Sequence, residues 1–114
     1  MNEIISKELL SEVYNFDVKD IRPLGTDDVT YEVRFNGLRK GYKYEIINIH
    51  ELADKTIDFI EKKGYWISKT QQNIYRLIHK DFEVYTVNTD KRIDVPFMMS
   101  QWILENEISD ENIS

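Results

Sequence analysis

The feature that most constrains the fold is a capped helix in the middle of the chain, between two strand-like segments. Asn48 is a favourable N-cap, and Glu51 three residues later completes a capping box with the backbone. Apolar residues then recur at helical spacing, and Gly64 supplies the left-handed residue that commonly ends a helix. The residues expected on the buried side are Ile49, Leu52, Ala53, Thr56, Ile57 and Ile60, with Phe59 at the margin. The pattern therefore predicts an amphipathic helix between Asn48 and Gly64.

Alternating apolar and polar residues predict strands on both sides of this helix. Before the helix, a hairpin turns at Asn36-Gly37, and after it two or three strands run between Tyr65 and Val87. The residues expected on the buried face of the first hairpin are Val29, Tyr31, Val33 and Phe35, and then Tyr42, Tyr44 and Ile46.

Two further helices are expected near the ends of the sequence. The first starts after Asn2 as N-cap and runs to about Tyr14, and the last runs from about Val95 to Glu105 after Asp94 as cap. A short edge strand is expected between them at Val18 and Ile21. The element order α-ββ-α-ββ(β)-α predicts an α+β fold with one antiparallel sheet of about four to six strands packed with three helices. We expect a single domain over residues 1–106 and an acidic, frayed tail over residues 107–114.

Composition limits the classes of function. The 114 residues include no cysteine, which leaves no disulfide, cysteine–zinc site or thiol nucleophile. The formal net charge of −6, from 21 acidic and 15 basic residues, disfavours direct binding to nucleic acid, whose phosphates attract lysine and arginine. Apolar runs fall far short of the roughly 20 residues of a membrane span, and the first residues lack a signal-peptide pattern. We therefore expect a cytoplasmic protein.

The start of the central helix resembles a damaged zinc motif. His50-Glu51-Leu52-Ala53-Asp54 differs from H-E-x-x-H only in its last residue, and aspartate can ligate zinc. Further ligands are scarce, because His79 is the one other histidine and lies in an expected turn. His50 and Asp54 are better explained as a surface pair four residues apart. No metal site, no cofactor and no catalytic residue is predicted, since nothing assembles a nucleophile with a base.

The exposed side of the central helix is the first candidate for binding a partner. The carboxylates expected there are Glu51, Asp54, Asp58 and Glu61, and the tail adds Glu107, Asp110 and Glu111. Lys55 and Lys62 follow Glu51 and Asp58 at the favourable spacing of four residues. An acidic stripe of this kind is either a solvated helix face or a surface that binds a basic partner.

The first hairpin is the alternative surface. Its aromatic and basic residues are Arg39, Lys40, Tyr42, Lys43 and Tyr44. Aromatic rings beside basic residues are typical of platforms for single-stranded nucleic acid, although an RNP-like pattern is missing. The same rings could bury an interface between copies of the chain, which leaves a homodimer open.

Residues 47–106 contain a recurrent pattern of a capped helix, a Gly-Tyr pair, two or three strands and a closing helix. The residues that form the pattern are Ile47, Asn48, Glu51, Leu52, Ala53, Lys55, Gly64, Tyr65, Ser100, Trp102, Ile103, Leu104, Glu105 and Asn106. In these residues the chain resembles short uncharacterised proteins encoded by bacteriophages and prophages. The resemblance implies an α-β-α sandwich-type domain and a non-enzymatic accessory protein that binds a host protein. Inhibitors of nucleic-acid-handling defence systems, including anti-CRISPR proteins, are the most specific version of that expectation.

Overall fold

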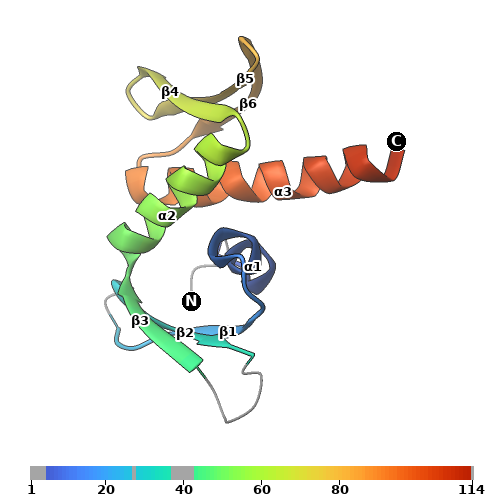
Figure 1. Cartoon of the computed structure of the whole chain (residues 1–114). Helices are drawn as coiled ribbons and strands as arrows, with labels where there is room; N and C mark the ends of the chain where they lie inside the picture. The colour runs from blue at the N-terminus through green and yellow to red at the C-terminus, as the bar shows by residue number, and fades with distance from the viewer. Residues whose placement is uncertain (1–4, 27, 37–42, 114) are drawn as a thin grey trace. The chain divides into compact units, whose positions relative to one another are not determined.

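The structure is a computed structural model that describes residues 5–26, 28–36 and 43–113. The predicted α+β class is confirmed (Figure 1). The elements in chain order are α1 (Lys7–Tyr14), β1 (Val18–Pro23), β2 (Thr30–Phe35), β3 (Lys43–Asn48), α2 (Ile49–Lys62), β4 (Tyr65–Gln71), β5 (Ile74–His79), β6 (Phe82–Asn88), the 3-10 helix η1 (Arg92–Asp94) and α3 (Val95–Ile113). The chain forms two compact units, unit 1 over residues 1–55 and unit 2 over residues 56–114.

The strands form two antiparallel sheets of three, in the orders β1-β2-β3 and β4-β5-β6. The prediction of a single sheet of about four to six strands is therefore wrong in this respect. Within each sheet, every strand pairs with the strand that precedes or follows it in the sequence. Alternation identifies strands but gives no information on whether distant hairpins pair, because that pairing depends on tertiary packing.

Unit 1 consists of α1, the sheet β1-β2-β3 and the first part of α2. Figure 1 shows α1 on one face of this sheet. The sheet turns Tyr31, Val33 and Phe35 inward, as the alternation predicts, whereas Val29 is 38% exposed. The expected edge strand at Val18 and Ile21 is confirmed as β1.

The first helix begins later than predicted. Ser6, rather than Asn2, is the N-cap of α1, and its Oγ accepts a hydrogen bond of 3.1 Å from the backbone N–H of Leu9. The backbone of Ser6 is extended, which suits an N-cap residue. Leu9 and Leu10 are buried on the apolar side of this helix, as their spacing predicts.

The prediction that Tyr44 and Ile46 lie on the buried face of β3 is wrong. Tyr44 and Ile46 are 60% and 56% exposed, whereas Ile47 is buried. The reason is the register with β2, in which Tyr31 pairs with Ile47. Side chains directly opposite each other lie on the same face, so the buried Tyr31 places Ile47 inside and the residues on either side of it outside. Tyr42, the third member of that expected face, lies outside the described residues.

The central helix follows β3 without a loop and matches the prediction closely. Asn48 Oδ1 accepts a hydrogen bond of 2.9 Å from the backbone N–H of Glu51. The second half of the predicted capping box differs, because the Glu51 carboxylate accepts from the side-chain amide of Asn48, at 3.0 Å. The residues buried along α2 are Ile49, Leu52, Ala53, Thr56, Phe59 and Ile60.

Unit 2 consists of the rest of α2, the sheet β4-β5-β6, η1 and α3. The expected turn after His79 is confirmed: Lys80 and Asp81 both have positive φ and join β5 to β6.

Helix α3 starts at Val95 as predicted but runs to Ile113 rather than ending near Glu105. No glycine or proline follows Pro96 to stop it, and Asn106 donates a hydrogen bond of 2.8 Å to the carbonyl of Trp102 one turn earlier.

The outer face of the sheet in unit 1 has an ion-pair cluster around Glu32. Glu32 Oε1 lies 2.6 Å from Arg34 Nε and 3.1 Å from Arg22 Nε. The hydrogen bond from Arg34 lowers the pKa of the Glu32 carboxyl below its ordinary value, and the charge of Arg22 adds to the effect. The charged carboxylate is therefore favoured in the folded state.

We predict that Glu32→Gln lowers the free energy of unfolding most at neutral pH. Because the pKa of Glu32 is lower in the folded state, its contribution is complete above the unfolded pKa of about 4.3 and is lost as pH falls through the folded pKa. Urea unfolding of both proteins at pH 7 and at decreasing pH measures the difference. Glu12→Gln, at an exposed position of α1, is the control, and a difference for Glu32 that stays constant over pH contradicts the prediction.

Gly64 offers a second test of the fold. Its φ is 86°, and a Cβ built there would meet the nearest atoms, in the His79 ring, at an ordinary 3.8 Å. Substitution therefore strains the backbone without a clash. We predict that Gly64→Ala lowers the free energy of unfolding by about 1 kcal/mol. Gly64→Asn should cost less, because asparagine tolerates the left-handed region. Equal losses for the two variants, measured by urea unfolding, would argue against a conformational cause.

Candidate functional site

The four carboxylates predicted on the exposed side of α2 are all exposed. Glu51, Asp54, Asp58 and Glu61 lie on successive turns of this one helix. Among the described residues, Asp54, Asp58 and Glu61 form no ion pair or side-chain hydrogen bond. The expected pair between Glu51 and Lys55 is wrong, because Glu51 bonds to the Asn48 side chain and Lys55 Nζ lies over the Tyr14 ring.

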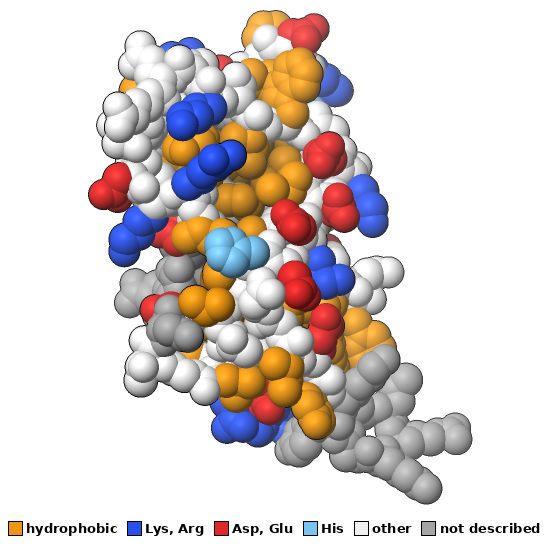
Figure 2. Space-filling view, turned by 90° about the vertical axis from the view of Figure 1, so that its left-hand side faces the viewer, with side chains coloured by type: hydrophobic (Ala, Val, Ile, Leu, Met, Phe, Trp, Pro, Cys, Tyr) orange, Lys and Arg blue, Asp and Glu red, His pale blue; other side chains and the backbone are white. Residues whose placement is uncertain are grey.

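Unit 2 contains a pocket next to the last of these carboxylates. Its volume is about 390 Å³, and it is lined by Ile57, Ile60, Glu61, Trp66, Ile67, Lys69, Tyr75, Arg92, Val95 and Pro96. These residues come from α2, β4, β5, η1 and the first turn of α3, and most of them are apolar. Trp66 is 56% exposed although it is large and apolar. The upper half of Figure 2 shows hydrophobic side chains gathered on this side of the protein, with basic and acidic side chains around them.

Three charged residues line this pocket. Glu61 is on α2, Lys69 is on β4 and Arg92 is on η1. Lys69 Nζ lies 5.7 Å from the centroid of the Tyr75 ring, and Arg92 and Glu61 form no ion pair within the described part of the chain. The pocket therefore combines an apolar lining with charged groups that remain available to a ligand.

Sequence reasoning identified Glu61 but missed the rest of this pocket. From the sequence, Trp66 and Ile67 were predicted only as the start of a strand and Val95 as the start of a helix, and no role was predicted for Arg92. The alternation of apolar and polar residues does not predict that Trp66 is exposed, because Tyr65 and Ile67 on either side of it are apolar too. The pocket forms where residues of five elements meet, and the pattern within any one element does not predict such a meeting.

The aromatic and basic hairpin surface is described only in part. Tyr44 is exposed on β3, beside Ile46. Arg39, Lys40 and Tyr42 lie outside the described residues, as does the side chain of Lys43. The nucleic-acid interpretation of this hairpin therefore stays a prediction.

The tail residues and the zinc-like motif complete the sequence-predicted candidates. Glu107, Asp110 and Glu111 belong to α3 by their backbone, and their side chains are outside the described part. His50 and Asp54 are both exposed in the first turns of α2, and the pair expected between them does not form. Over residues 5–26, 28–36 and 43–106, no three histidine, aspartate or glutamate side chains gather as metal ligands would.

No helix in the described ranges has the length and apolar character needed to cross a bilayer. Comparison with protein-family models, with curated proteins and with solved structures gives no match. The resemblance to short phage and prophage proteins therefore stays a prediction, and the site is interpreted from its own geometry.

Proposed function

We propose that this protein acts by binding another protein, and that the pocket of unit 2 is the centre of the binding surface. The observation that carries the proposal is an exposed Trp66 at an apolar pocket of about 390 Å³, with Glu61 in its lining. An exposed tryptophan beside an apolar pocket is typical of protein-binding surfaces, where tryptophan often contributes much of the affinity.

The exposed carboxylates of α2 in unit 2 indicate part of the chemistry of the partner. Asp58 and Glu61 lie on one side of α2, exposed and without ion pairs among the described residues. Carboxylates that form no ion pair among the described residues attract basic groups, and they speed association with a basic surface. The proposed partner presents an apolar side chain to the pocket and lysine or arginine to these carboxylates.

A basic partner is consistent with the resemblance seen in the sequence. Proteins that handle nucleic acid have basic surfaces, because they must neutralise phosphates. We therefore propose that the partner is a host protein of this class, and that the protein inhibits it by covering its basic surface. Inhibition of a nuclease or CRISPR effector is the specific form of this proposal.

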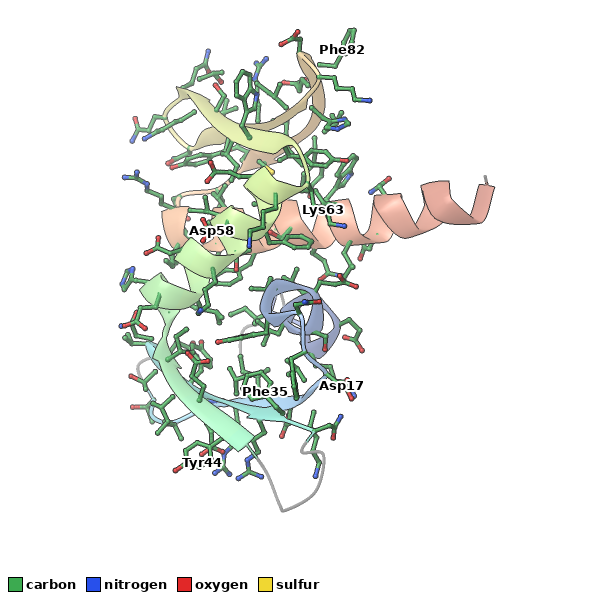
Figure 3. The ribbon with its side chains drawn as sticks, in the orientation of Figure 1. Asp17, Phe35, Tyr44, Asp58, Lys63 and Phe82 are labelled. Atoms are coloured by element: carbon green, nitrogen blue, oxygen red, sulfur yellow. The ribbon has the colours of Figure 1, made fainter. Side chains whose placement is uncertain are left out.

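The test is capture of a partner from bacterial lysate by the immobilised full chain. Trp66→Ser should lower the affinity for the captured protein at least about tenfold, since tryptophan is a frequent hot spot. Phe82→Ser is the matched control, because Phe82 is 73% exposed at the β5–β6 turn (Figure 3) and does not line the pocket. Equal loss of binding in both variants, or in neither, would contradict the assignment to the pocket.

A second pair of variants tests the charges. Asp58→Asn with Glu61→Gln should lower the association rate, and the effect should shrink at high salt because exposed charges are screened. Glu8→Gln with Glu12→Gln removes the same net charge from α1 and should leave the rate nearly unchanged. Association rates measured by biosensor at two salt concentrations separate the specific effect from that of net charge.

Self-association is the second candidate function, and one observation favours it. Tyr44 and Ile46 are large, more than half exposed, and adjacent on the outer face of β3, which is an edge strand. Unpaired edge strands with apolar side chains readily pair with another copy. A homo-oligomeric structural or packaging protein would use this surface.

We predict for this candidate that the mass measured by light scattering rises above 13.7 kDa with concentration. Replacing Tyr44 and Ile46 by serine should abolish the rise, because it removes the exposed apolar side chains that would be buried. Trp66→Ser should not abolish it. A mass that stays at that of one chain at high concentration rejects the candidate.

A further inference from the structure

Unit 1 contains a second pocket, which is largely aromatic. Its volume is about 400 Å³, and Tyr14, Phe16, Phe35, Tyr44 and Glu45 line it. The Tyr14 and Phe16 rings pack edge-to-face against Phe35, with centroid distances of 5.1 and 5.6 Å. Figure 3 shows Phe35 on the side of the sheet that faces α1 and Tyr44 on the opposite side. The packed rings of Tyr14, Phe16 and Phe35 and the Glu45 carboxylate define the chemistry of this aromatic pocket, and Tyr44 borders it.

The aromatic pocket favours positive charge. Glu45 is half-buried and forms no ion pair among the described residues. The Tyr14 hydroxyl is buried next to the Glu45 carboxylate. Burial raises the pKa of Tyr14 strongly, and the negative charge of Glu45, a hydrogen bond with Glu45 and the charge of Glu51 raise it further. The phenol therefore stays neutral, next to a carboxylate that forms no ion pair among the described residues.

A cation from the chain itself already lies against one of these rings. Lys55 Nζ is 5.4 Å from the centroid of the Tyr14 ring, within the range of a cation–π interaction. Lys55 forms no ion pair with Glu45, so the carboxylate is not neutralised by it. The ring face attracts an ammonium group while the rest of the pocket keeps its negative charge.

We propose that the aromatic pocket binds an alkylammonium group, as a small free compound. Alkyl groups on nitrogen would contact Phe16 and Tyr14, and the positive charge would lie near Glu45. Aromatic rings combined with a carboxylate recognise such cations, because the rings present negative faces and the methyl groups lose water on binding. This site is independent of the protein-binding surface of unit 2, and each can fail without the other.

The test is an NMR titration of the full chain with choline and with 3,3-dimethylbutan-1-ol, which has the same shape without the charge. Choline should bind at least about tenfold more tightly, because the neutral compound lacks the cation–π and carboxylate interactions. The NMR signal of the choline methyl groups should also shift upfield, because protons above the face of an aromatic ring are shielded. Equal binding of the two compounds overturns the proposal.

Variants locate the site. Glu45→Gln and Phe16→Leu should each weaken choline binding at least about fivefold, whereas Glu12→Gln, which also removes one charge from unit 1, should not. Lys55→Met should tighten binding, because it removes the cation that competes for the Tyr14 ring. Weaker binding in Lys55→Met, or unchanged binding in both pocket variants, overturns the assignment. Phe16 is 41% exposed, so its variant should remain folded, and a thermal unfolding curve checks this.

A short peptide containing trimethyllysine distinguishes the source of the cation. Binding no tighter than that of choline assigns the pocket to a free compound, as proposed. If the peptide binds at least about tenfold more tightly than choline, its backbone adds contacts, and the natural ligand of the aromatic pocket is a side chain of another protein. That result overturns the proposal of a small free compound.

Discussion

Burial of one side of α2 is the constraint on which the rest of the structure depends. Leu52 and Thr56 are fully buried and Ile60 is nearly so, and α2 contributes residues to both compact units. Burying a leucine or isoleucine side chain stabilises a fold by about 1.5–3 kcal/mol, so these positions tolerate little change. Asn48 fixes where the helix begins, because it is both the last residue of β3 and the N-cap of α2. Any shift of this start would rotate the buried residues away from the core.

The functional surfaces follow from the same constraint. With its apolar side buried, α2 must present its carboxylates to solvent, and Glu61 then lines the pocket of unit 2, with Asp58 three residues before it on the same helix. Lys55 sits about two turns after the cap at Asn48 and lies over Tyr14 rather than beside Glu51. One helix therefore provides the carboxylates of the proposed protein-binding surface and the cation that borders the aromatic pocket of unit 1.

Features that depend only on neighbouring residues in the sequence were predictable. The cap at Asn48, the stop at Gly64 and the turn at Lys80-Asp81 were predicted because each depends on residues within one turn. The misassigned residues depended on distant partners. Tyr44 and Ile46 alternate as a buried face would, but pairing between Tyr31 and Ile47 places them outside. The chain offered two apolar residues in succession, Ile46 and Ile47, and only the register with β2 could choose between them.

The sequence by itself determined the α+β class, the position of α2 and the exposure of its four carboxylates, because periodicity and capping act over a few residues. The tertiary structure decided that the strands form two sheets of three, which face of β3 is buried, and which side chains meet in each pocket. Trp66, Arg92 and Glu61 come from three different elements, and no spacing along the chain relates them. Pockets arise from packing between elements, and packing depends on the shape and burial of residues far apart in sequence.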